Sequence, residues 1–166
     1  FDDIHDLFVP MGLLIKNSRV IANGDDGIEF DGVTAQDVTF KGDIIAENGT
    51  VTADGLGVGV FIRDNDLNDG FESHFTNFVI EDSYLGQAPD GAGGGFGGNA
   101  KSGFDANDSN FTGVAFVDSF FNGNGTSGDG DGIRFLGGSI DQGQVTFYQG
   151  GMSVPACLPS GRKALP

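Results

Sequence analysis

The feature that most constrains the fold of this chain is a segment that recurs along it. The segment is clearest in residues 113–135, GVAFVDSFFNGNGTSGDGDGIRF, and in residues 12–30, GLLIKNSRVIANGDDGIEF. Both copies have alternating apolar residues after a Gly, then Ser, an apolar pair, Asn-Gly and Asp-Gly-Ile-x-Phe. Further copies begin at Asp37, Asn77 and Gln144. Repeats of this kind predict stacked structural units, since one unit cannot bury its apolar face alone.

The copies predict β-strands that each bury one face. Apolar residues recur two positions apart with polar residues between them, which is the periodicity of a half-buried strand. The segments are also short, rich in β-branched and aromatic residues, and interrupted by Gly and Asn, which disfavours helices. Three apolar sets are therefore expected to stack in register: Leu13, Val38, Phe78, Val114 and Val145; Ile15, Phe40, Ile80, Phe116 and Phe147; Val20, Ile45, Leu85, Phe121 and Met152.

A second strand is predicted after the turn of each copy. Residues 27–30 match residues 132–135, and residues 59–62 and 103–106 are looser versions of the same pattern. The turns recur as well, because Asn-Gly stands at the same offset at Asn23, Asn48 and Asn124. Asn and Gly tolerate the left-handed backbone conformation that such corners require.

These V-x-F-x-[DN]-S-x-[FIV] runs, followed by N-G and D-G-I-x-F, resemble the repeats of the right-handed parallel β-helix family. That family includes pectate-lyase-like and parallel β-helix repeat proteins, and the resemblance covers about residues 12–151. It implies an all-β, right-handed parallel β-helix solenoid of about five irregular coils, one for each copy. Apolar centres five residues apart, as at Phe111, Phe116 and Phe121, also resemble pentapeptide-repeat proteins, an alternative that the irregular insertions disfavour.

The repeats divide the chain into three parts. Residues 1–11 are expected to form an N-terminal cap, because Ile4, Leu7 and Phe8 have the spacing of a short one-sided helix over residues 1–9. Residues 12–151 are expected to form the β-helix, with insertions near 53–76 and 86–102. Residues 152–166 are expected to form an extended C-terminal tail or a C-terminal cover.

Composition narrows the range of partners. The net charge of −16, from 24 acidic and eight basic residues, disfavours nucleic acid because its phosphates would be repelled. No apolar run is long enough to span a bilayer. Cys157 is the single cysteine, so no internal disulfide framework is expected. The acidic balance fits a secreted protein, and we expect an extracellular or cell-surface location.

Two acidic loops are candidate calcium sites. Asp64, Asp66 and Asn68 precede Gly70, and Asp129 and Asp131 alternate with Gly. Alternating side-chain oxygens that end at a Gly can surround a hard cation such as Ca²⁺. Neither loop supplies the bidentate Glu of an EF-hand, and solvated turn aspartates are the alternative interpretation.

Asp25 and Asp26 are weak candidates for catalysis. Polygalacturonase-like β-helix enzymes, which this chain resembles in its repeats, use adjacent aspartates to cleave sugar-acid polymers. Those enzymes also carry Gly-His-Gly and Arg-x-Lys, whereas His5 and His74 are the two histidines here and neither has that setting. Lyases of the same family use a basic residue above bound calcium, and Arg63, beside an acidic loop, comes closest to this arrangement.

The sequence therefore predicts a non-enzymatic, structural or adhesive β-helix, because repetition is present without a matching catalytic set. The alternative is a carbohydrate-active β-helix enzyme, namely a polysaccharide lyase, hydrolase or epimerase, or a fragment of one. An ice-binding module is a weaker third possibility. Ice-binding faces need a regular ladder of Thr residues, and outward Thr residues such as Thr39 and Thr146 do not recur in every coil.

Self-association is also predicted. The ends of a β-helix expose unpaired strand edges, which another chain can extend. Residues 1–11 or 152–166 are expected to pack against a neighbouring subunit. Head-to-tail addition does not close on itself, so a filament is the expected product.

Overall fold

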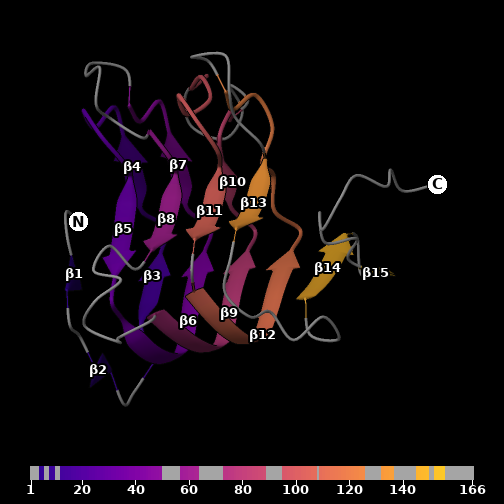
Figure 1. Ribbon diagram of the computed structural model, residues 1–166. Helices are drawn as coiled ribbons and strands as arrows, with labels where there is room; N and C mark the ends of the chain where they lie inside the picture. The colour runs from indigo at the N-terminus through magenta and orange to yellow at the C-terminus, as the bar shows by residue number, and fades with distance from the viewer. Residues whose placement is uncertain are drawn as a thin grey trace.

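The computed structural model describes residues 4–5, 8–9, 12–49, 57–63, 73–88, 95–107, 109–125, 132–136, 145–149 and 152–155. Every regular element in these residues is a β-strand, which confirms the all-β prediction (Figure 1). In the same residues, no helix is long and apolar enough to cross a membrane.

The strands form three sheets. Sheet A is fully parallel and contains β1 (Ile4–His5), β5 (Ile28–Asp31), β8 (Val60–Arg63), β11 (Phe104–Asn107) and β13 (Ile133–Leu136), in that order. Sheet C is also parallel and contains β4 (Arg19–Ile21), β7 (Ile44–Ala46) and β10 (Tyr84–Leu85).

Sheet B is the widest sheet of the described residues. Its parallel strands are β2 (Phe8–Val9), β6 (Thr34–Lys41), β9 (Ser73–Glu81), β12 (Ser109–Val117) and β14 (Val145–Gln149), and β3 (Leu14–Lys16) also pairs with β6. At one end β15 (Met152–Pro155) pairs with β14 in the antiparallel direction.

The chain visits the three sheets in turn. It runs from β5 in sheet A to β6 in sheet B and β7 in sheet C, and then returns to sheet A as β8, beside β5. Strands β8, β9 and β10 repeat this path, and equivalent strands stand side by side (Figure 1). The parallel strands and this recurring path fit a parallel β-helix solenoid, as predicted, while the number of coils stays a prediction.

The predicted register is confirmed for most of the three sets, and Met152 is the exception. It lies in β15 and pairs with Gln149 of sheet B, so it does not continue the set of Val20, Ile45 and Leu85 in sheet C. In sheet B, Val38, Phe78, Val114 and Val145 are paired in series, and so are Phe40, Ile80, Phe116 and Phe147. In sheet C, Ile45 pairs with both Val20 and Leu85. In sheet A, the Gly-Ile-x-Phe copies align through Ile28, Val60, Phe104 and Ile133. In β6, β9 and β12 the alternation therefore delivers the same apolar position to the interior in successive coils.

Phenylalanine rings fill much of that interior. Phe75 and Phe111 are stacked, with ring centroids 5.5 Å apart, and Phe75 also meets Phe78 edge to face at 5.4 Å. Phe104 contacts Phe116 edge to face at 5.4 Å. Offset and edge-to-face pairs of this kind add to the stabilisation that burial of the rings provides.

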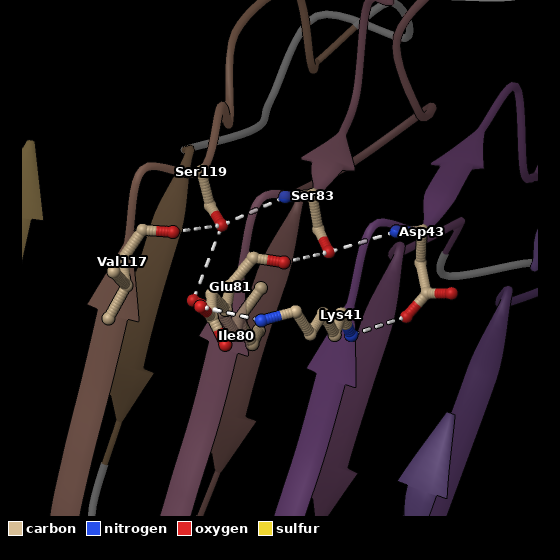
Figure 2. Close-up of polar contacts among 7 residues, drawn as sticks. All are labelled: Lys41, Asp43, Ile80, Glu81, Ser83, Val117 and Ser119. Carbon is tan, nitrogen blue, oxygen red and sulfur yellow. Dashed lines mark hydrogen bonds and ion pairs between the residues drawn. The ribbon is translucent and has the colours of Figure 1, made fainter. Parts of the chain in front are cut away.

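A ladder of hydrogen bonds runs along the corner between sheets B and C (Figure 2). The backbone N–H of Ser18 donates to Asp43 Oδ1 at 2.7 Å, that of Asp43 to Ser83 Oγ at 3.0 Å, and that of Ser83 to Ser119 Oγ at 3.1 Å. Asp43 is fully buried, and burial raises its pKa above the usual value. The backbone N–H groups of Ser18 and Lys41 donate to its carboxylate and offset part of this rise. Each bond of the ladder joins one coil to the next.

A second ladder runs along the corner between sheets C and A. The side-chain Nδ2 of Asn23 donates to Asn48 Oδ1 at 2.9 Å, that of Asn48 to Asn99 Oδ1 at 2.8 Å, and that of Asn99 to Asn124 Oδ1 at 3.0 Å. The backbone N–H of each donor residue reaches the same oxygen. Gly59 shows why the neighbouring position must stay small, since a Cβ there would lie 2.9 Å from Asn99 Nδ2 and 2.5 Å from the Gly103 carbonyl oxygen.

Two sequence expectations need correction. Ile4–His5 and Phe8–Val9 are strands that extend sheets A and B, and not parts of the expected helix over residues 1–9. The interval expected as the first insertion, 53–76, contains β8 and the start of β9, which are regular parts of a coil. At residues 4–9 the adjacent parallel strands supply backbone partners, which outweighs the helical spacing. The bounds of the insertion were too wide, since residues 59–62 already matched the strand pattern of the other copies.

The C-terminal tail begins as a strand. Its first residues form β15, which pairs with β14 of the same chain. This strand edge is therefore occupied from within the chain. Residues 156–166, including Cys157, lie outside the described residues.

Phe116→Ala tests the core. The side chain is 2% exposed and packs against Phe104 and Phe121, so its truncation should lower the free energy of unfolding by about 3–5 kcal/mol. Urea denaturation measures the loss. Thr112→Ala, on the exposed face of the same strand, is the control and should change stability by less than about 0.5 kcal/mol. Equal effects of the two substitutions would contradict the assigned core.

Candidate functional site

The outward face of sheet A carries a row of three charged residues and one aromatic residue. Glu29, Phe61, Asp105 and Arg134 occupy equivalent positions on four successive strands. They alternate with interior residues such as Ile28, so their side chains leave the sheet on its outer side. The two carboxylates are nevertheless buried, since Glu29 is 7% exposed and Asp105 is fully buried. Charges removed from water in this way interact more strongly than they would on an open surface.

Arginines accompany these carboxylates. Arg63 forms an ion pair with Glu29, and its Nε lies 3.4 Å from Asp31 Oδ2. Arg134 donates to Asp105 Oδ2 from Nε at 2.8 Å and also from Nη2. The guanidinium of Arg63 further lies 5.5 Å from the centre of the Phe61 ring, a cation–π distance. We call Asp26, Glu29, Asp31, Arg63, Asp105 and Arg134 the sheet A cluster.

Asp26 is the member of the cluster with the most altered acidity. It lies at the corner before β5 and accepts the N–H of Val58 at 2.7 Å. Burial raises its pKa from 3.8 to about 7, the Val58 N–H lowers it, and the charges of Asp25 and Glu29 raise it further. A carboxyl group that exchanges its proton near neutral pH can act as a general acid or base.

The two residues of the predicted catalytic pair, Asp25 and Asp26, lie in different surroundings. Asp25 is exposed, whereas Asp26 is partly buried beside Glu29 and Arg63, whose charges act on it. Arg63 lies within this cluster, as part of its ion pairs. His74 is exposed on sheet B, in register with Thr34 and Asn110.

The structure does not test the predicted calcium ligands. Asp64, Asp66, Asn68, Asp129 and Asp131 all lie outside the described residues, so the calcium site stays a prediction. Among the residues that the structure does describe, no group of three or more His, Cys, Asp or Glu side chains could hold a metal ion.

Sequence reasoning missed four members of the cluster, namely Glu29, Asp31, Asp105 and Arg134. A signal was present in the aligned strand copies, because Gly-Ile-Glu-Phe, Gly-Phe-Asp-Ala and Gly-Ile-Arg-Phe place Glu29, Asp105 and Arg134 at one position. Opposite charges at one position of a stacked repeat indicate ion pairing between coils. Their burial could not be read from alternation, which marks them as outward-facing.

Asp26→Asn tests the acidity of the cluster. Because the folded-state pKa of Asp26, about 7, exceeds the value of 3.8 expected when unfolded, the folded protein binds the proton more tightly. Stability should therefore fall as pH rises from about 4 to about 7 and stay reduced above that. Asparagine keeps an acceptor for the Val58 N–H without the charge. The variant should be more stable than wild type above pH 7, on the order of 1–2 kcal/mol after solvent screening, and should converge with it at acid pH.

Urea denaturation at a series of pH values measures this difference. Asp25→Asn is the matched control. It removes an exposed neighbouring charge that raises the pKa of Asp26 less than burial does, so most of the pH dependence should remain. A stability difference between Asp26→Asn and wild type that did not change with pH would contradict the raised pKa.

Comparisons with protein-family models, with curated proteins and with solved structures found no match for this chain.

Proposed function

We propose that this chain is a structural and adhesive β-helix of the right-handed parallel kind, acting outside the cell or at its surface. The observation that carries the proposal is the pair of polar ladders at the corners. The residues that recur from copy to copy, Ser at one corner and Asn at the other, are used to join successive coils. Because the repeated polar residues hold successive coils together, we expect the chain to be a stiff scaffold.

The scaffold presents one broad polar face. Gln36, Thr76 and Thr112 are exposed and in register across β6, β9 and β12. A second row lies two residues earlier on the same strands and contains Thr34, His74 and Asn110. Hydroxyl and amide groups both donate and accept hydrogen bonds. Repeated at the strand spacing of about 4.8 Å, they suit an extended, hydroxyl-rich polymer such as a polysaccharide.

The bend in these strands is fixed between coils. Asn77 Nδ2 donates to Asp37 Oδ1 at 2.9 Å, and both residues have left-handed backbone conformations, with φ of 57° and 51°. Gly113 takes the equivalent place on β12 with φ of 79°. The polar rows therefore lie on a backbone whose local geometry repeats, which favours binding to a regular polymer.

An attachment assay tests the adhesive function. Beads coated with the chain should bind surfaces of immobilised polysaccharide, and a triple variant Gln36→Glu, Thr76→Glu, Thr112→Glu should detach under flow. Negative charge replaces the row of neutral donors in that variant while the interior stays unchanged. Asn122→Glu, at an exposed corner away from sheet B, is the control and should keep attachment. Attachment unaffected by the triple variant, or absent on neutral and acidic polysaccharides alike, would contradict the proposal.

A carbohydrate-active enzyme is the second candidate, and Asp26 is the observation that favours it. Its pKa of about 7 and its position beside Glu29 and Arg63 give a proton donor or acceptor next to other charged groups. Such a group fits the acid–base step of polysaccharide cleavage.

Self-association through residues 1–11 or 152–166 stays a prediction. In the second of these segments, β15 already pairs with β14 of the same chain.

Assays on acidic polysaccharides distinguish the two candidates. The enzyme candidate predicts release of new chain ends by the wild-type protein and loss of at least about a hundredfold in rate with Asp26→Asn, the usual contribution of a general acid or base. Asp25→Asn should retain activity. Product formation that persisted at the wild-type rate in Asp26→Asn would exclude the cluster as the catalytic site.

A further inference from the structure

Four asparagines in the described residues are followed by glycine: Asn23, Asn48, Asn122 and Asn124. All four lie at the corner that follows sheet C. Because glycine has no Cβ, its backbone nitrogen can approach the side-chain carbonyl carbon of the preceding asparagine more freely than any other residue allows. The local sequence is thus the same at four places, while the surroundings differ.

Asn48 is held from all sides. It is fully buried, and its Oδ1 accepts the N–H of Asn23 at 3.2 Å and the Nδ2 of Asn23 at 2.9 Å. Its Nδ2 donates to Asn99 Oδ1 at 2.8 Å. The nitrogen of Gly49 is also fixed, because its N–H donates to the Asn23 carbonyl oxygen at 3.0 Å.

Asn124 is held in the same manner. Its Oδ1 accepts from Asn99 and its Nδ2 donates to the carbonyl oxygens of Leu85 at 2.8 Å and Phe121 at 2.9 Å. The N–H of Gly125 donates to the Lys101 carbonyl oxygen at 2.7 Å. In both ladder residues the side chain and the following nitrogen are therefore engaged in bonds to other coils.

Asn122 and Asn23 are placed differently. Asn122 is exposed, and its side chain makes no hydrogen bond with the described residues. Asn23 is exposed at the end of the ladder, where its Nδ2 has the bond to Asn48 Oδ1 and its own Oδ1 accepts none from the described part of the chain. Both side chains can rotate toward the following nitrogen at a smaller cost than Asn48 or Asn124.

We propose that the folded protein directs spontaneous deamidation to Asn122 and Asn23 and protects Asn48 and Asn124. The nitrogen of Gly123 or Gly24 attacks the asparagine Cγ, a new C–N bond forms, and the C–Nδ2 bond breaks. Ammonia leaves with the proton that the glycine nitrogen gives up. Water then opens the resulting succinimide at either carbonyl, which yields aspartate or isoaspartate, and no oxidant or reductant takes part.

The two sites differ in their consequence. Deamidation of Asn122 adds a charge at an exposed corner outside the ladder. Deamidation of Asn23 replaces the Nδ2 donor by a carboxylate oxygen that faces Asn48 Oδ1, so an attractive contact becomes repulsive. It also adds the first negative charge to residues 12–24, which contain Lys16 and Arg19 and no acidic residue. Loosening of the ladder should therefore begin at its Asn23 end.

The test is incubation of the full chain at mildly alkaline pH, followed by proteolysis, mass spectrometry and isoaspartate labelling of each Asn-Gly peptide. Asn122 should react fastest and Asn23 next. Asn48 and Asn124 should be slower by at least about tenfold, the factor set by a local opening cost of about 1.4 kcal/mol. In urea the four rates should become similar, which separates structural protection from intrinsic reactivity.

Two variants test whether the ladder causes the protection. Asn99→Ala removes a partner of both Asn48 and Asn124 and should raise their rates while leaving Asn122 unchanged. If Asn99→Ala does not fold by circular dichroism, Asn23→Ser replaces it and should raise the rate at Asn48 but not at Asn124. Equal rates at the four sites in the folded protein, or protection of Asn122, would overturn the proposal.

Discussion

The interaction on which the rest of this structure depends is the hydrogen bond from a corner backbone N–H to a side-chain oxygen in the following coil. At a corner the chain leaves one sheet for the next, and its backbone groups lose their regular partners. Buried N–H groups without partners are strongly unfavourable. The oxygens of Asp43 and Ser83 at one corner, and of Asn48 and Asn99 at the other, supply those partners. Since each oxygen fixes one coil against its neighbour, the register of the three sheets follows from the corners.

Much of this arrangement could be predicted from the sequence. The alternation through Val38 and Phe40, repeated at Val114 and Phe116, predicted both the strands and their pairing. The offset of the Asn-Gly pairs predicted the corners but not the ladder. Asn and Gly suit a left-handed corner whether or not the Asn side chain bonds to a neighbouring coil, so the pattern alone does not indicate the side-chain hydrogen bonds. Asn99 was missed since Ala100 follows it, within a glycine-rich stretch that reads as a loop.

The remaining features depend on tertiary contacts that periodicity does not encode. The spacing of Ile4 and Phe8 fits one face of a helix, yet the edges of β5 and β6 offered parallel partners and both residues became parts of strands. The sheet A cluster was hidden for a related reason. Glu29 and Asp105 alternate with apolar residues as solvated side chains would, so their burial and their pairing with Arg63 and Arg134 required the structure.

The unequal lengths of the coils have a consequence for how such a chain can diversify. Ladder bonds of the same chemistry close segments of 25 residues between Ser18 and Asp43, 40 between Asp43 and Ser83, and 51 between Asn48 and Asn99. Loop-closure entropy grows only logarithmically with length, so a doubling adds about 0.6 kcal/mol to the free energy of closing the loop. The stretch between Asn48 and Asn99 shows that a long excursion still returns to the same hydrogen-bonding position. Corners of this solenoid are therefore suitable sites at which to graft whole foreign modules.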